Sequence, residues 1–230
     1  MKRCILITFT LVLFVKAASA QNLTRTPTLS AGAQLAVPRG EYAHFYKGTP
    51  VGINAALSSP LLKLPIEVGG GFSWNVIGSE AREISFFNSD GDVQKGKLIL
   101  NGNAYTYYVH TRLRPFNGRF RPYGELIAGM RTYSVKSKLH LVTPYGTDLK
   151  PVKMVNDRDF TWVTGWAAGI QYRLLPGVFV EGRFEKLKGD RAQYINPHTI
   201  NIMQNGDYSY ENQQSRTDQL TFSIGLAFSF

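Results

Sequence analysis

The sequence predicts an all-β fold, an eight-stranded antiparallel up-and-down barrel that crosses a membrane. Three observations predict it. Apolar and small or polar residues alternate in eight separate segments, the connections between these segments alternate between short and long, and the charged residues of the segments fall on the face opposite the apolar side chains. Successive side chains of a strand point to opposite faces, so each segment has one apolar and one polar face.

The segment 220–230 shows the alternation most clearly. Its apolar face consists of Leu220, Phe222, Ile224, Leu226, Phe228 and Phe230. Threonine, serine, glycine and alanine occupy the other positions. In water this strand would be an aggregation-prone edge, whereas in a membrane barrel its apolar face contacts lipid.

Seven earlier segments repeat the pattern. We expect strands at about 29–37, 50–58, 66–77, 98–113, 121–133, 159–173 and 178–187. Short connections containing Pro or Gly lie at 59–65, 114–120 and 174–177, and long polar loops at 38–49, 78–97, 134–158 and 188–215. Short turns at one rim and long loops at the other are typical of bacterial outer-membrane barrels. An even number of strands returns both chain ends to the short-turn, periplasmic rim.

The beginning of the chain predicts export. Met1, Lys2 and Arg3 precede an apolar run of twelve residues, and the sequence Ala18-Ser19-Ala20 fits a signal-peptide cleavage site. We therefore expect residues 1–20 to be a signal peptide and residues 21–230 to form one barrel domain. Cys4 is the only cysteine and lies in the signal, so the mature chain has no disulfide.

The composition agrees with a membrane barrel, and its basic charge does not by itself indicate a nucleic-acid partner. Aromatic residues make up 13% of the chain, and the formal charge is +10, of which Lys2, Arg3 and Lys16 belong to the signal. A basic chain can bind nucleic acid. For an exported protein the nearer anionic partners are outer-membrane lipids and lipopolysaccharide.

The charged residues of the strands test the assignment of faces. Eight of them share the face of the glycines and serines: Glu67, Arg112, Glu125, Arg131, Arg173, Glu181, Arg183 and Glu185. A slip of one residue would turn all of them towards lipid, where a basic residue costs about 2–4 kcal/mol at the midplane. Because an eight-stranded barrel has room inside only for side chains, we expect paired Arg and Glu to fill it as an interior charge network.

These features resemble the small eight-stranded outer-membrane barrels of the OmpX and OmpA transmembrane-domain type. The resemblance rests on the signal, the eight strands, three short turns, four long loops and the final Phe230, and it covers the mature chain. It implies that the last strand is read by the barrel-assembly machinery, with Phe222, Phe228 and Phe230 as the assembly signal. It implies no catalytic motif.

Candidate catalytic and metal sites are weak in this sequence. His110 shares the inward face with Arg112, but His44, His140 and His198 lie in or beside long loops without a recognisable nucleophile partner. Residues 88–92 resemble the start of a calcium loop but lack its glycine and its closing glutamate. We therefore expect no enzyme, cofactor or metal.

Four functions are considered at this stage. The first is a structural or surface-interaction barrel with a filled interior, whose loops 134–158 and 188–215 contact an external protein or glycan. The second is a narrow channel for ions or small solutes, gated by exchange among the interior ion pairs. The third is an outer-membrane lipid-modifying enzyme. The fourth, a soluble lipocalin-like barrel, would leave Trp74, Trp166 and Phe222 exposed to water.

Overall fold

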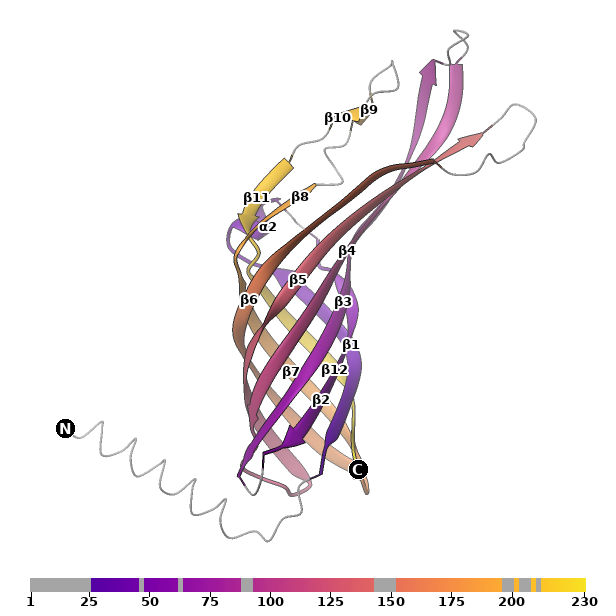
Figure 1. Cartoon of the computed structure of the whole chain (residues 1–230). Helices are drawn as coiled ribbons and strands as arrows, with labels where there is room; N and C mark the ends of the chain where they lie inside the picture. Colours follow the sequence, from indigo (N-terminus) through magenta and orange to yellow (C-terminus); the bar gives the residue numbers. More distant parts are fainter. Residues whose placement is uncertain are drawn as a thin grey trace, which may run out of the picture.

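The computed structural model describes residues 26–45, 48–61, 64–87, 93–142, 152–195, 201–202, 208–209 and 212–230. These residues form a tall, closed barrel with slanted strands (Figure 1). The predicted signal peptide and the calcium-like segment 88–92 lie outside the described residues.

Eight long strands make the barrel wall. They are β1 (Thr28–Pro38), β2 (Val51–Pro60), β3 (Ile66–Phe87), β4 (Val93–Leu113), β5 (Phe120–Val142), β6 (Val152–Leu175), β7 (Val178–Gly189) and β12 (Gln219–Ser229). The order around the wall is β1-β12-β7-β6-β5-β4-β3-β2, and every neighbouring pair is antiparallel. The predicted eight-stranded up-and-down barrel is therefore confirmed.

The last strand closes the barrel against the first. Residues Thr28–Pro38 of β1 pair with Gln219–Ser229 of β12 over their full length, with Gly32 opposite Gly225. A side chain at either glycine would run into the backbone of the partner strand, so the two strands approach closely at the seam. Closure removes the open edge that the apolar last strand would otherwise present.

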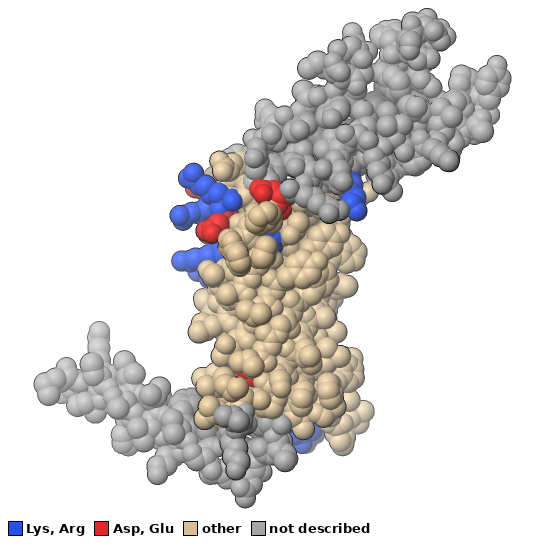
Figure 2. All heavy atoms as spheres, viewed as in Figure 1, with Lys and Arg blue, Asp and Glu red and all other residues tan. Residues whose placement is uncertain are grey.

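The apolar faces point outwards, as predicted. Leu35, Leu126, Trp162 and Ile224 are among the exposed large apolar residues of the wall. No helix within the described part of the chain is long and apolar enough to cross a membrane. The outer surface between the two rims carries almost no charge in the view of Figure 2, where basic and acidic atoms gather at the two ends. A closed barrel whose outer surface carries an apolar, uncharged belt between two polar rims is an outer-membrane barrel. The chain is accordingly a protein of the bacterial outer membrane.

The structure corrects the prediction for two of the long loops. Most of 78–97 and the flanks of 134–158 are strand, because β3 to β6 continue for 21 to 24 residues each. A strand needs only about 9–11 residues to cross the membrane. In Figure 1 these four strands leave the barrel at the end opposite the C-terminus and lean outwards as a projecting sheet.

The other two long loops contain short elements that the sequence pattern did not predict. The first holds a one-turn helix, α2 (Glu41–Phe45). The last holds β8 (Arg191–Ile195), β9 (Asn201–Ile202), β10 (Tyr208–Ser209) and β11 (Asn212–Arg216). β8 pairs with β11, and β9 with β10.

Candidate functional site: the filled lumen

A connected set of ion pairs fills the lumen from its periplasmic end to just beyond the middle of the wall. Six of the eight predicted charges take part, namely Glu67, Arg112, Glu125, Glu181, Arg183 and Glu185. They come from β3, β4, β5 and β7, and the register sets Arg112 directly between Glu67 and Glu125 on the neighbouring strands. Side chains of opposite charge that lie directly opposite each other on the inward face are close enough to form ion pairs.

Arg112 is the centre of this network. Its Nε donates to Glu125 Oε1 at 2.6 Å, and its terminal nitrogens lie 3.6 Å from Glu181 Oε1 and 4.0 Å from Glu67 Oε2. Its guanidinium carbon also lies 4.1 Å from the centroid of the Tyr123 ring. Arg112 is 1% exposed, so three carboxylates and an aromatic face replace the water that a guanidinium needs.

Arg183 forms the second centre. Its Nη2 lies 2.9 Å from Glu125 Oε2 and 2.7 Å from Glu185 Oε2. Glu125 therefore bridges the two arginines, with one oxygen on each. A carboxylate held at both oxygens has little freedom to rotate, which makes the network a rigid filling of the lumen.

Two tyrosines complete the packing around the arginines by lying over glycines. A Cβ at Gly71 would overlap the ring of Tyr108, and a Cβ at Gly169 would overlap the ring of Tyr123. The Tyr123 hydroxyl donates to Glu181 Oε1. These inward glycines therefore provide the space in which the tyrosine rings lie flat against the wall.

The remaining predicted charges lie apart from the network. The Arg131 side chain points inward nearer the external end, where it donates to Thr106 Oγ1 and to the Thr217 carbonyl. Arg173 donates to the Asn117 carbonyl at the periplasmic end.

Arg114, which the sequence analysis omitted because it lies just past the fourth strand, does join the network. Its Nη2 is 2.5 Å from Glu67 Oε1. Arg114 follows Arg112 by two residues and so continues the inward parity of β4 by one step. The two-residue spacing from Arg112 therefore indicates in the sequence that Arg114 points inward.

The external end of the lumen is closed differently, by α2. Tyr42 of this helix is 2% exposed and packs with Ala104, Tyr133 and Ala192. Glu41 accepts a hydrogen bond from the backbone N–H of Arg216, which ties the helix to β11. Between this cap and the ion pairs lies a small apolar cluster of inward side chains, Tyr108, Ile127, Val163, Ala167 and Leu187.

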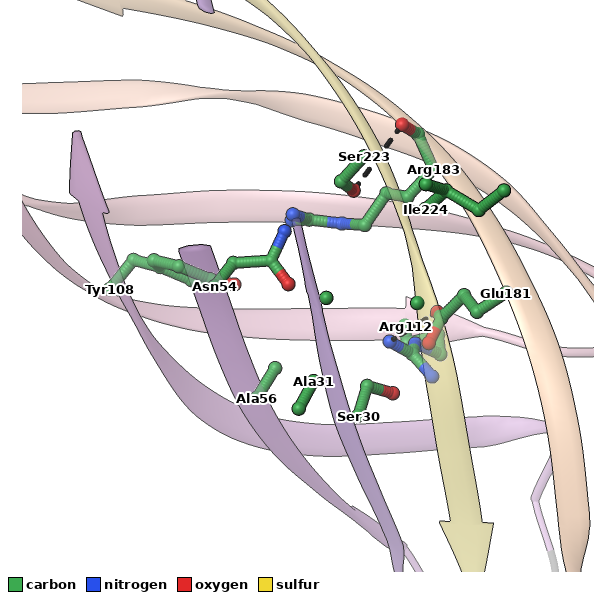
Figure 3. A pocket seen from close by; sticks show the side chains of 12 residues that line it. Ser30, Ala31, Asn54, Ala56, Tyr108, Arg112, Glu181, Arg183, Ser223 and Ile224 are labelled. Atoms are coloured by element: carbon green, nitrogen blue, oxygen red, sulfur yellow. Dashed lines mark hydrogen bonds and ion pairs between the residues drawn. The ribbon is translucent and has the colours of Figure 1, made fainter. Parts of the chain in front are cut away.

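A small cavity lies within the lumen. An interior cavity of about 20 Å³ lies beside Arg112 and Arg183 and is lined by small residues of the seam such as Ser30, Ala31 and Ser223 (Figure 3). One water molecule needs about 10–15 Å³, so this cavity holds one or two waters.

The lumen contains one pair of the kind that hydrolases use. Ser58 Oγ lies 2.9 Å from His110 Nε2, and both residues are buried. The other ring nitrogen, His110 Nδ1, has no hydrogen-bond partner among the described residues, so no carboxylate orients the imidazole as in a catalytic triad. The described residues contain no group of three or more potential metal ligands.

The predicted assembly signal and lipid-contacting residues lie on the outer surface. Phe222, Phe228 and Phe230 are all exposed on the outward face. At the external end, Lys136, Lys186, Lys188, Arg191 and Arg216 are exposed, and Figure 2 shows basic atoms gathered there. Of the predicted contact loops, residues 143–151, 196–200, 203–207 and 210–211 lie outside the described part.

No protein-family model and no curated protein matches the chain. Among solved structures it is similar to Ail of Yersinia pestis, determined with the heparin analogue sucrose octasulfate, at 14% identity, covering 90% of this chain and 100% of that one with a TM-score of 0.44. It is similar to Neisserial surface protein A at 13% identity, 89% and 97% coverage and a TM-score of 0.40. A major outer membrane protein from Thermus thermophilus aligns at 10% identity, 89% and 99% coverage and a TM-score of 0.48.

Proposed function

We propose that this protein is a non-conducting outer-membrane barrel that carries a rigid projecting sheet for contact with partners outside the cell. The observation that carries the proposal is the length of β3 to β6, which run for 21 to 24 residues where about 9–11 suffice to cross the membrane. Backbone ladders between these strands continue well beyond the wall, up to Phe87 opposite Val93.

The projecting sheet has an open edge at β3. The ladder between β2 and β3 ends where Val51 faces Val76, whereas β4 pairs with β3 onward from Gly78 to Phe87. Over this stretch β3 has no ladder partner on its other side within the described residues. An unpaired edge can take up an extended segment of another protein through main-chain hydrogen bonds, which makes β-strand addition the favoured mode of contact.

The filled lumen favours this function over transport. A solute would have to pass the α2 cap at Tyr42, the apolar cluster around Val163 and the ion pairs of Arg112 and Arg183. The hydrogen bond between Arg112 and Glu125 supports a structural role for the network.

Planar-bilayer recording tests the non-conducting state. We expect the refolded wild-type protein to show no steady conductance. Steady conductance that Arg112→Ala or Glu125→Ala alters would contradict the proposal and favour a narrow channel through the ion pairs.

Shortening the sheet tests the contact function. In the register Ser79 lies opposite Asn101, so residues 80–100 can be replaced by an Asn-Gly turn that suits a two-residue hairpin. We expect this variant to fold as the wild type does. Bacteria displaying it should lose adhesion to surfaces coated with extracellular-matrix protein.

A matched control comes from the last loop. Gln193 lies opposite Gln214 in the β8–β11 ladder, so residues 194–213 can be replaced by the same turn. Adhesion that persists in this control and is lost in the first variant supports contact through the projecting sheet. The reverse result would move the contact to 188–215, and unchanged adhesion in both would contradict contact by either segment.

A further inference from the structure

A second group of basic side chains lies at the periplasmic end, apart from the ion-pair network. Arg121 of β5 and Arg173 of β6 both approach the ring of Phe179, which is itself buried on β7. Their guanidinium carbons lie 4.0 Å and 5.5 Å from the ring centroid. One aromatic ring therefore holds two positive charges close together.

Among the described residues this pair of arginines forms no ion pair with a carboxylate. The charged neighbours of Arg121 are Arg114, Arg173 and Glu67. Glu67 is already bound to Arg114 at 2.5 Å and faces Arg112 with its other oxygen. No carboxylate of the described residues lies within 4.0 Å of Arg121 or Arg173, although Arg121 is only 8% exposed. Two neighbouring guanidinium groups, of which Arg121 is buried and Arg173 half-buried, are costly when no anion accompanies them.

Backbone carbonyls hold the two side chains without neutralising them. Arg121 Nε donates to the Gly118 carbonyl at 3.3 Å, and Arg173 Nη2 donates to the Asn117 carbonyl at 3.4 Å. Both acceptors belong to the short turn between β4 and β5 at the periplasmic mouth. The guanidinium groups are therefore positioned at the rim, where an anion can arrive from the periplasm.

Two N–H donors at this place lack an acceptor. Gln171 lies directly opposite Arg121 in the β5–β6 ladder and is fully buried. Its Oε1 accepts from Arg114, while its Nε2 has no hydrogen-bond partner among the described residues. The same holds for Arg173 Nε. A buried donor without an acceptor costs about 1–3 kcal/mol, which a bound acceptor would remove.

We propose that Arg121, Arg173 and Gln171 form a binding site for a phosphate oxyanion at the periplasmic mouth of the barrel. The planar guanidinium group matches phosphate oxygens in a two-pronged hydrogen bond, and the Gln171 amide supplies a neutral donor. The phosphate comes from free phosphate in the periplasm or from a phospholipid headgroup of the adjoining leaflet. Figure 2 shows basic atoms reaching the surface at this lower end of the barrel.

Calorimetric titration of the full chain, refolded in maltoside micelles that contain no phosphate, tests the site. Inorganic phosphate is added at constant ionic strength maintained with chloride. We expect saturable binding to the wild type and binding at least about 10-fold weaker in the Arg121→Gln/Arg173→Gln variant. Arg119→Gln is the matched control, because Arg119 is exposed beside them and stacks on the outward Tyr172 at 5.8 Å. It should bind phosphate as the wild type does.

Thermal unfolding gives a second readout. A ligand that binds only the folded state raises the unfolding midpoint as its concentration exceeds the dissociation constant. Phosphate should raise the midpoint of the wild type and of Arg119→Gln, and leave that of the double variant unchanged. If the double variant does not fold, Gln171→Met keeps both charges and should still weaken binding several-fold.

Nanodiscs separate the two sources of phosphate. If a headgroup fills the site, phospholipid discs should abolish the effect of free phosphate that is seen in phosphate-free maltoside micelles. If free phosphate is the ligand, its effect should be the same in discs and in micelles. Two results would overturn the proposal: no saturable phosphate effect on the wild type, or equal binding by the wild type and every variant of the site.

Discussion

Tyr42 packs edge-on against Tyr133, with ring centroids 6.2 Å apart and planes inclined by 66°. This contact fixes a five-residue helix over the external end of a barrel whose other end is filled by ion pairs. A helix of one turn has almost no stability of its own. Its position therefore depends on this aromatic contact and on the hydrogen bond that the Arg216 backbone N–H donates to the Glu41 carboxylate.

Replacing Tyr42 with Ala should therefore release the cap and leave the barrel intact. We expect trypsin to cleave after Arg39 at least about 10-fold faster, because the loss of roughly 1.4 kcal/mol of local stability changes the open population tenfold. The denaturant midpoint of the barrel should stay the same. His44→Ala is the control, since His44 is exposed on the same helix. Equal cleavage rates for the two variants would show that Tyr42 does not hold the cap.

Arg112 tests the ion-pair network. Its replacement by Ala leaves the carboxylates of Glu67, Glu125 and Glu181 without their shared cation in a site that bulk water hardly reaches. Breaking a buried pair in this way costs about 3–5 kcal/mol. Equilibrium unfolding by guanidinium chloride in micelles measures the loss.

The control for this measurement is Arg119→Ala. Arg119 is exposed and lies outside the network, so its removal should change the free energy of unfolding by less than about 0.5 kcal/mol. A loss at Arg112 as small as that at Arg119 would mean that the ion pairs contribute no net stability.

Replacing glycine with alanine should affect stability differently on the inward and outward faces of the wall. Gly71→Ala and Gly169→Ala place a methyl group into the rings of Tyr108 and Tyr123, and overpacking of this kind costs about 1–3 kcal/mol. Gly124 and Gly182 meet nothing within 4 Å, so Ala at either position should be neutral or stabilising by up to about 1 kcal/mol. Unfolding midpoints of the four variants should fall into these two groups. Similar losses at all four would indicate that the tyrosine rings can move away.

The sequence pattern predicted the barrel wall because lipid imposes a strict rule on it. Within the hydrocarbon layer every outward side chain must be apolar, so Leu126, Trp166 and Ile224 reveal their faces by parity alone. Inward charges such as Glu125 and Arg183 follow from the same parity. Their detailed partners depend on tilt and rotamers, so parity alone does not reveal that Arg131 lies apart from the network.

The elements outside the membrane escaped prediction for a physical reason. Above the wall, water reaches both faces of a strand, so the extensions of β3 to β6 need no alternation, and their sequence resembles that of loops. The helix α2 is too short to show a helical period. Arg114 lies one residue past the end of β4, so the strand pattern does not include it, although its parity with Arg112 points it inward.

The depth of the strands in the bilayer can be tested with two equally exposed residues. Ile224 is 68% exposed at the middle of β12, and Leu175 is 63% exposed at the last position of β6, beside the periplasmic turn. Ile224→Arg should lower the free energy of unfolding from lipid vesicles by about 2–4 kcal/mol, because it puts a charge at the bilayer midplane. Leu175→Arg should cost about 0–1 kcal/mol, because its charge reaches the headgroups. Equal costs at the two positions would place the midplane elsewhere along the strands, since the two side chains differ in depth and hardly in exposure.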